Sequence, residues 1–280
     1  MINSFEFTSL PQGKVIICVC DQIYFENFFN KLYISFSQNV SEFDQIHAHI
    51  INPDISLINK IKSNIKLNVS FSWEGSEQLN KLSNQKINIK KLDKCLPAKI
   101  KRMLLAEYLR GKPYLQFLYD HLMSLGISWR YLISKDYIYK SLPKTYYASR
   151  RFALPRILFK NVSHALFIDI DSIFNKDLKI SFNEGSSTKA IRRKEPGWSM
   201  FYAGLVFVRM DREGKFFLEK IYNMIQKSIE ENEFYWGIDQ VCLDKCYEKN
   251  LLDSFSKNHM DFAQDSNASF ISYKGDKKWK

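Results

Sequence analysis

The sequence predicts an α/β fold in which a mostly parallel central sheet is covered by helices on both faces. Apolar runs of strand length alternate with segments whose apolar residues recur every three or four positions, which is typical of strand-helix-strand units. Within residues 164–174, an apolar run ends in two carboxylates, Asp169 and Asp171, one residue apart. Ligands bind at the carboxyl ends of strands in open α/β sheets, so this stretch predicts both a buried strand and a candidate site.

The N-terminal part of the chain predicts strand, helix and strand in turn. Residues 14–20 form an apolar run that suits a strand buried on both faces. Asp21 follows, and apolar residues at helical spacing then continue to Phe36. Two more strands are predicted, one at residues 45–51, just before Asn52 and Pro53, and one at residues 65–71.

The second half of the chain continues the alternation. A helix is predicted at about residues 145–159, and a buried strand at residues 166–168 leads into the two acids. A further strand is predicted at residues 201–209, with helices at about residues 214–231 and 237–247. No internal repeat interrupts this order.

Asp169 and Asp171 are candidate metal ligands. Residues two apart on an extended chain project to the same side, and paired carboxylates suit a hard divalent cation that shares its coordination with substrate phosphates. The alternative is that one Asp caps a following helix while the other is solvated. The spacing alone does not decide between the two.

Length and composition indicate a globular protein. The 280 residues suffice for one main domain with an insertion, and 45% hydrophobic and 25% charged residues exclude disorder of the whole chain. No secretory signal and no apolar run of spanning length is apparent, which predicts a cytoplasmic protein. The five cysteines are odd in number and form no paired CxxC motif, so reduced thiols are expected. Cys18 and Cys20 share one face of a predicted strand, where they are expected to pack in the core.

The positive charge is concentrated in one region. Residues 86–146 contain thirteen Lys and Arg against four Asp and Glu, or +9 of the formal net charge of +11. We therefore divide the chain into a catalytic domain, residues 1–85 and 145–280, and a basic helical insertion, residues 86–144. The insertion suits an acceptor-binding subdomain or a peripheral contact with an anionic membrane. A solvated charged face over an ordinary core explains the same pattern.

Six short segments form a pattern in both content and order. They are Asp21 with Tyr24, residues 145–152 with Arg151, Asp169-Ile170-Asp171, Tyr202-Ala203-Gly204, Asp239-Gln240, and residues 272–279 with Lys278. In this order the chain resembles the GT-A glycosyltransferases, and most nearly the family 8 galactosyl and glucosyl transferases of bacterial surface synthesis. The resemblance covers most of the chain outside residues 86–144.

The resemblance implies a binding site for a nucleotide-sugar donor. Asp169 and Asp171 would hold Mn²⁺ or Mg²⁺, which stabilises the charge of a departing diphosphate. Asp21 and Tyr24 would contact the nucleoside, the ring by stacking on the base. Arg151 would lie near the acidic pair.

The remaining motifs complete the implied site. Ala203 and Gly204 belong to the donor-binding set, and Lys278 would touch the diphosphate. Asp239 and Gln240 would lie beside the sugar as catalytic residues, where an amide can steady positive charge at the anomeric carbon.

Structural alternatives stand beside several of these roles. Tyr24 could pack under the sheet, and Arg151 could be a structural ion-pair partner, with Arg150 competing for its role. Asp239 could be a helix cap, and Lys278 could belong to a charged tail.

Two positions depart from the family pattern. Ser272 stands where the family has a His that supplies a third metal ligand. Tyr202 stands where the family has an Asn that contacts the donor sugar.

Taken together, the sequence predicts a hexosyltransferase. Its donor would be a nucleotide-diphosphate sugar, and a UDP-sugar is the foremost expectation. Its acceptor would be a glycan or lipid-linked molecule of bacterial surface polysaccharide synthesis. The family implies metal dependence and retention of the anomeric configuration. The alternatives are an inactive binding module of the same fold and a metal-dependent nucleotidyltransferase. Nucleic-acid binding is not expected, because no RNA- or DNA-binding motif accompanies the basic charge. We expect the protein in the cytoplasm, including the inner face of the membrane.

Overall fold

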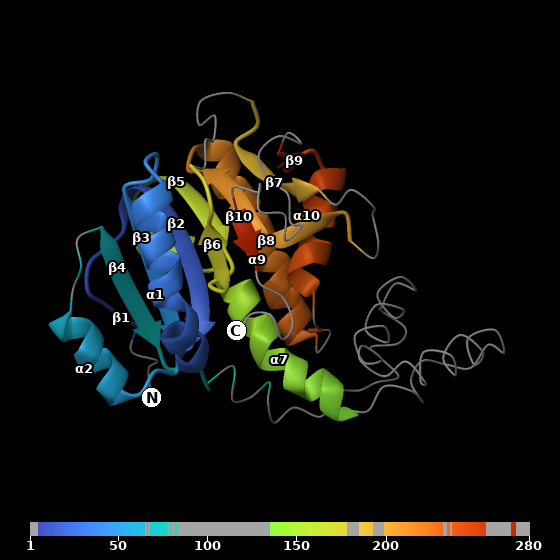
Figure 1. Cartoon of the computed structure of the whole chain (residues 1–280). Helices are drawn as coiled ribbons and strands as arrows, with labels where there is room; N and C mark the ends of the chain where they lie inside the picture. The colour runs from blue at the N-terminus through green and yellow to red at the C-terminus, as the bar shows by residue number, and fades with distance from the viewer. Residues whose placement is uncertain are drawn as a thin grey trace, which may run out of the picture.

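The computed structural model confirms the predicted α/β class. An eight-stranded sheet has the order β1-β4-β3-β2-β5-β8-β7-β9, and a two-stranded sheet pairs β10 with β6 (Figure 1). The structure describes residues 5–64, 66, 68–77, 79, 82, 135–177, 185–192, 199–231, 234, 235, 237–255 and 270–272.

The strands and helices have the following bounds. The strands are β1 (Glu6–Phe7), β2 (Gln12–Asp21), β3 (Gln45–Ile51), β4 (Val69–Glu74), β5 (Asn161–Ile168), β6 (Ser172–Phe174), β7 (Thr188–Arg192), β8 (Phe201–Arg209), β9 (Asp253–Ser254) and β10 (Phe270–Ser272). The helices are α1 (Gln22–Asn39), α2 (Ile55–Ser63), α7 (Lys135–Arg150), α8 (Pro155–Leu158), α9 (Arg212–Glu230) and α10 (Ile238–Glu248).

The centre of the large sheet is parallel. Strands β4, β3, β2 and β5 pair in parallel, and α1 and α2 form the connections from β2 to β3 and from β3 to β4. Strand β8 pairs antiparallel with β5, and β7 antiparallel with β8. The carboxyl ends of the four parallel strands therefore share one edge of the sheet, on the side where α7 lies (Figure 1).

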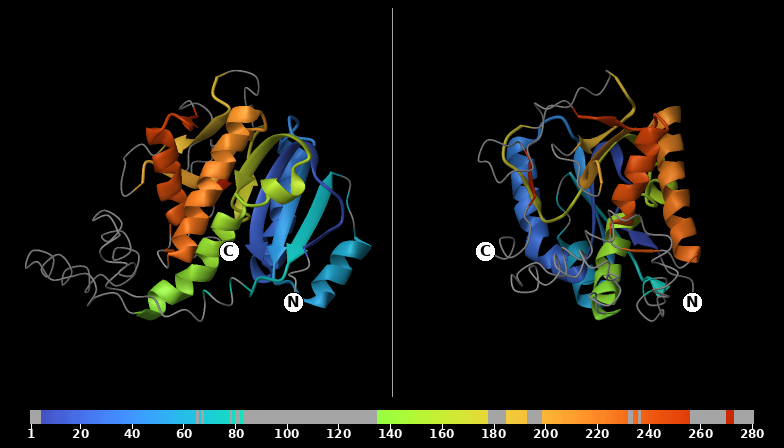
Figure 2. Two further views of the ribbon diagram at one scale, coloured as in Figure 1. Left: turned by 180° about the vertical axis from the view of Figure 1, so that it is seen from behind. Right: turned by 90° about the vertical axis from the view of Figure 1, so that its right-hand side faces the viewer.

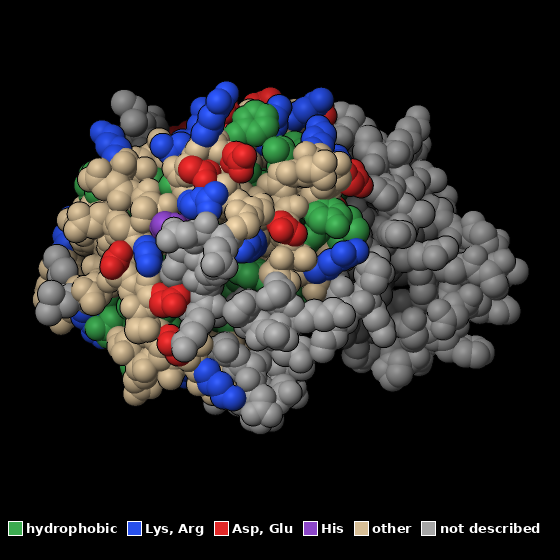
Figure 3. Space-filling view, turned by 90° about the horizontal axis from the view of Figure 1, so that it is seen from above, with side chains coloured by type: hydrophobic (Ala, Val, Ile, Leu, Met, Phe, Trp, Pro, Cys, Tyr) green, Lys and Arg blue, Asp and Glu red, His purple; other side chains and the backbone are tan. Residues whose placement is uncertain are grey.

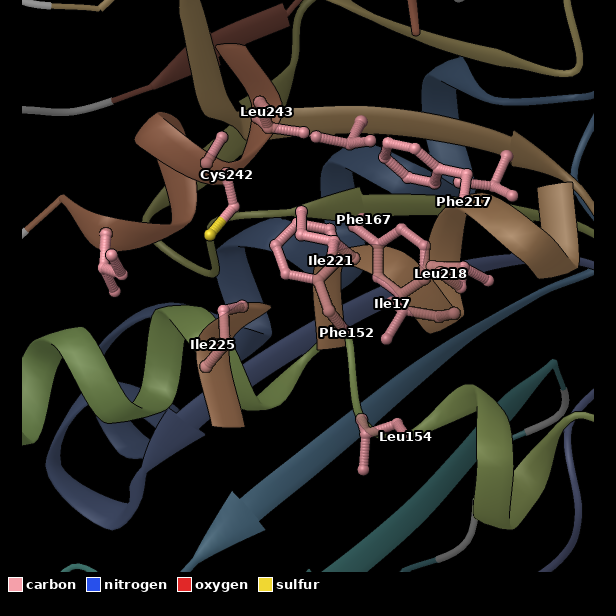
Figure 4. Packing of buried hydrophobic residues seen from close by; sticks show 14 of the residues in the cluster. Ile17, Phe152, Leu154, Phe167, Phe217, Leu218, Ile221, Ile225, Cys242 and Leu243 are labelled. Carbon is pink, nitrogen blue, oxygen red and sulfur yellow. The ribbon is translucent and has the colours of Figure 1, made fainter. Parts of the chain in front are cut away.

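Helices cover both faces of the sheet. Helices α1 and α2 lie on one face, and α7, α9 and α10 lie on the other (Figures 1 and 2). Successive residues of β5 point to opposite faces, so Leu166 joins the core under α1 while Phe167 joins the core under α9. Phe152 lies next to Phe167, with ring centroids 5.5 Å apart (Figure 4). The strand before the acidic pair is thus buried on both faces, as predicted.

Several predicted boundaries require correction. Strands β3 and β8 match the expected residues 45–51 and 201–209. Strand β4 begins at Val69 instead of residue 65, because Asn68 adopts a left-handed φ of 61° and the extended chain starts after it. Helix α7 begins at Lys135 instead of about residue 145 because it accommodates Pro143 in its interior. A new helix, α8, starts at Pro155, a residue favoured in a first helical turn.

Part of the predicted domain division lies outside the described residues. Residues 83–134, most of the proposed insertion, belong to this part, and so does most of the predicted basic excess. The boundaries at 85, 86, 144 and 145 stay predictions. Figure 3 views the end of the sheet away from α7, where the described acidic and basic side chains are interspersed.

Two further predictions concern thiols and membranes. Cys18 and Cys20 are buried in the core under α1, as expected. Burial raises the pKa of the Cys18 thiol to about 12, which keeps it protonated at neutral pH. No helix in the described part of the chain is both long and apolar enough to cross a bilayer.

Candidate functional site

The acidic pair lies at the carboxyl edge of the parallel strands. The register of β2 and β5 pairs Cys18 with Ile168, the last residue of β5. Asp21 lies three residues after Cys18, and Asp171 lies three residues after Ile168. Both acids of the pair follow the strand, and β6 comes next, so neither acid caps a following helix. That alternative from the sequence was wrong.

Arg151 connects two of the predicted motifs. Its Nη1 lies 2.9 Å from Oδ1 of Asp169, and its Nη2 lies 3.5 Å from Oδ2 of Asp239. Its Nε also donates a hydrogen bond of 2.5 Å to the carbonyl oxygen of Ala148. The side chain of Asp169 stays 38% exposed, whereas those of Arg151 and Asp239 are 4% and 5% exposed. One buried guanidinium is thus shared by two acids, one of which faces solvent.

Gly204 of β8 lies directly against Asp169. The backbone N–H of Asp169 donates to the Gly204 carbonyl at 3.3 Å. A Cβ added at Gly204 would lie 2.6 Å from Oδ2 of Asp169, closer than atoms can approach without movement. The neighbouring Ala203 packs in the core under α9. Of this predicted pair, Gly204 is the residue that contacts the acidic motif.

The C-terminal strand returns to the acidic pair. Strand β10 pairs antiparallel with β6 so that Ser272 lies opposite Ser172, the residue after Asp171. Asp171 is half-buried and has an interaction partner within the chain. The segment predicted to carry Lys278 therefore starts next to the motif. Lys278 and the side chain of Ser272 lie outside the described residues.

Asp239 and Gln240 lie in the first turn of α10. The N-cap of this helix is Gly237, at φ 82°, so Asp239 is not the cap. Burial raises the pKa of the Asp239 carboxyl, the charge of Arg151 opposes this shift, and the charge of Asp169 adds to it. The Gln240 N–H donates to Asp239 Oδ1 at 2.9 Å, and Gln240 itself is half-buried. The amino end of a helix also favours a negative charge.

Asp21 and Tyr24 form a helix cap. Oδ1 of Asp21 accepts a hydrogen bond of 2.8 Å from the Tyr24 N–H at the start of α1. The Tyr24 ring packs next to Phe28, 5.5 Å between centroids, at the border of the core under α1. The nucleoside contacts expected of both residues stay predictions. Tyr147 also lies near this edge of the sheet. Its pKa is raised to about 12, mainly by burial and further by the charges of Asp21 and Cys20.

Arg150 belongs to a different cluster. Its Nε and Nη2 donate to the two carboxylate oxygens of Glu74 at 2.6 and 2.5 Å. Of the two arginines, Arg151 is the one that reaches Asp169, and its role toward a donor stays a prediction. The sequence did not single out Glu74. Its signal was an acid at the end of an actual strand, β4, the kind of position that also distinguished Asp21 and Asp169, but the predicted strand stopped at residue 71.

The residues at this edge fit a hard divalent cation. Within the described residues, no group of three or more His, Cys, Asp or Glu could hold a metal. Asp169 is partly exposed, and the lack of a side chain at Gly204 leaves room for its Oδ2. Mg²⁺ at nucleotide sites uses one or two carboxylates together with substrate phosphates, and Mn²⁺ accepts the same oxygen ligands. Asp169 and Asp171 therefore suit a cation that binds together with a diphosphate.

Fold and site together define an α/β protein with an arginine-linked acidic site at the carboxyl edge of its sheet. No known protein family and no curated protein matches the sequence. The solved structures that are similar to this chain include one of the glycosyltransferase GlyE from Streptococcus pneumoniae TIGR4 and one of its apo form. They share 12% and 13% identity with this chain, each at a TM-score of 0.49. The alignments cover 96% and 95% of this chain but 56% and 55% of theirs, so this chain spans just over half their length.

Proposed function

We propose that this protein is a GT-A glycosyltransferase that moves a hexose from a UDP-sugar to a glycan or lipid-linked acceptor of bacterial surface polysaccharide synthesis. Transfer would depend on Mn²⁺ or Mg²⁺ and would retain the anomeric configuration. Metal dependence and retention come from the resemblance to family 8.

The observation that carries the proposal is the position of Arg151. Three motifs far apart in the sequence meet in it, because it extends from the end of α7 to Asp169 and to Asp239. An arginine shared by two acids, one of them partly exposed, leaves negative charge at the edge of the sheet. Such a site favours a cation and, through it, a diphosphate.

Each side chain has a chemical task in this proposal. The metal ion, held by Asp169 and Asp171, would stabilise the negative charge on the leaving diphosphate. Arg151 orients Asp169 and keeps Asp239 in place. Gln240 would direct its amide oxygen to positive charge at the anomeric carbon, and Lys278 would add a cation to the diphosphate.

The acceptor and the location of the protein follow from the basic region. We assign residues 86–144 to acceptor binding, since their positive charge suits a phosphorylated or lipid-linked molecule. The same charge would place the protein at the cytoplasmic face of an anionic membrane.

The test is release of UDP from a panel of UDP-sugars, with Mn²⁺ or Mg²⁺ and with glycan acceptors. We expect wild-type protein to release UDP and form a glycosylated product, and D171N to lose at least about 100-fold in rate with its fold intact. D177N is the matched control, because Asp177 is an exposed acid six residues further along the chain.

Other outcomes separate the competing functions. UDP binding without release, over the whole panel, would favour an inactive binding module. Release of pyrophosphate from a nucleoside triphosphate would favour a nucleotidyltransferase. Full transfer by D171N would exclude the role assigned to the acidic pair.

A further inference from the structure

Helix α7 is attached to the end of β4 at two points, one turn apart. Tyr146 and Arg150 are four residues apart and so lie on the same face of the helix. Arg150 forms the bidentate ion pair with Glu74, whose side chain is 6% exposed. The hydroxyl of Ser76 donates to the phenolic oxygen of Tyr146 at 2.9 Å. Two hydrogen-bonded contacts therefore fix both the position and the rotation of the last turn of α7.

Glu74 is itself backed by a buried polar chain. Along β3 and β4, contacts of 2.8 Å join Ser70 to His47, His47 to Ser72, and Ser72 to His49. His49 Nε2 lies 3.4 Å from Oε1 of Glu74. Each of these five side chains belongs to a buried residue, 0–4% exposed.

The Gln45 amide sets the direction of this chain. Its Oε1 only accepts, so the Ser70 hydroxyl donates to it at 3.1 Å and accepts from His47 Nδ1–H. Burial lowers the pKa of both imidazoles, that of His47 to about 3, so each ring is neutral, with one donor and one acceptor. Ser72 therefore donates to His47 Nε2 and accepts from His49 Nδ1–H. His49 Nε2 makes no hydrogen bond with the described residues, so the side-chain hydrogen bonds of Glu74 come from Arg150.

The arginine that follows Arg150 is the one in the candidate site. Arg151 is the first residue after α7, and its Nε–H bonds back to Ala148 in the last turn of that helix. Neighbouring residues at a helix end project in directions about 100° apart, the rotation per residue. Holding Arg150 against β4 therefore directs Arg151 away from β4, toward β5 and α10.

We propose that Glu74 is a positioning residue: its ion pair with Arg150 fixes the end of α7 in the orientation that directs Arg151 at the acidic motif. Glu74 lies outside the proposed site and acts through the two arginines. Its effect on donor binding rests on the proposed function, whereas its effect on Arg151 does not.

The experiment compares E74Q with R150K and with a matched control, D211N. Asp211 is also an arginine-paired carboxylate, 2.6 Å from Arg209, but it lies at the other end of β8, before α9. The first readout is hydrogen exchange of the Arg151 Nε–H by NMR, which needs no ligand. The second is calorimetric titration with UDP in the presence of Mn²⁺.

In E74Q, we expect exchange at Arg151 Nε–H to accelerate at least about tenfold and UDP affinity to fall about 10- to 100-fold, the range for groups that orient direct ligands. R150K keeps the charge but loses the two-pronged contact, so it should shift both readouts in the same direction by less. D211N should change neither.

Two results would overturn or divide the proposal. An Arg151 Nε–H that exchanges at the wild-type rate in folded E74Q would overturn it. If E74Q does not fold, the same result in R150K would do so. Faster exchange in E74Q together with no UDP binding by the wild-type protein would support the positioning role and refute the proposed donor site.

Discussion

Two consecutive arginines at the end of α7 lie in carboxylate clusters of opposite character. Arg150 meets one acid, Glu74, with matched geometry and matched charge. Arg151 is shared by Asp169 and Asp239, and one of its acids is 38% exposed. Among the described residues, the first cluster pairs one positive charge with one negative charge. The second pairs one positive charge with two acids, and the side chain of one of them is partly exposed.

The difference distinguishes a structural ion pair from a candidate binding site. A buried pair of equal and opposite charges, joined by two hydrogen bonds, has no net charge left to attract a ligand. A shared arginine leaves one acid incompletely neutralised, and a cation from outside can complete the set. Sequence spacing cannot make this distinction, because the two arginines are neighbours in the chain.

The largest effect is expected from R151Q. The substitution leaves Asp239 buried without its cationic partner, so the free energy of unfolding should fall by about 3–5 kcal/mol. Release of UDP from UDP-sugars should fall at least about 100-fold. Urea unfolding and a UDP-release assay measure the two effects. R156K is the control, since Arg156 is exposed on α8 next to Tyr222. Unchanged stability and activity in R151Q would remove the distinction between the clusters.

The sequence anticipated the edge of the site better than its connections. Strand ends followed by acids were visible in the pattern, and the structure has Asp21 and Asp169 at the same edge. Glu74 escaped notice because β4 was placed four residues too early, with Asn68 inside the predicted strand. The choice between Arg150 and Arg151 depended on the rotation of α7, which tertiary contacts with Glu74 and Ser76 determine.

The next effect concerns acid stability and tests the closed cluster. Burial by itself raises the pKa of Glu74, but His49 and Arg150 lower it from 4.5 to about 2. The unfolded chain therefore binds more protons between these values, so the stabilisation is complete above about pH 4.5 and is lost as the pH falls to 2. Its full size is about 3 kcal/mol.

Urea unfolding of wild type and E74Q, from about pH 2 to neutral pH, measures the stabilisation that the ionised Glu74 contributes. The difference between the two should be largest near neutral pH and shrink toward pH 2. E26Q is the control, because Glu26 is exposed on α1, and its difference from wild type should not depend on pH in this way. A constant gap between wild type and E74Q would show that the ionised carboxylate does not stabilise the fold.

A smaller effect is expected from G204A, which tests the open cluster. The added methyl group would lie 2.6 Å from Asp169 Oδ2, so the carboxylate must move away. We expect a loss of about 1–3 kcal/mol in stability and a weaker Mn²⁺-dependent affinity for UDP. Gly75 offers a control, since a Cβ there would meet no atom within 4 Å. Equal UDP affinity in G204A and G75A would mean that Asp169 does not contribute to nucleotide binding.

The smallest change in stability is expected at Asp21, where a cap and a proposed ligand contact coincide. D21N keeps an oxygen for the Tyr24 N–H, so stability should change by less than about 0.5 kcal/mol, whereas D21A should cost about 1 kcal/mol. If Asp21 also contacts the nucleoside, D21N should weaken UDP binding although the cap is preserved. D54N is the matched control, because Asp54 caps α2 in the same way. UDP affinity that falls only in D21A, along with stability, would reduce Asp21 to its capping role and move the nucleoside site elsewhere on the edge.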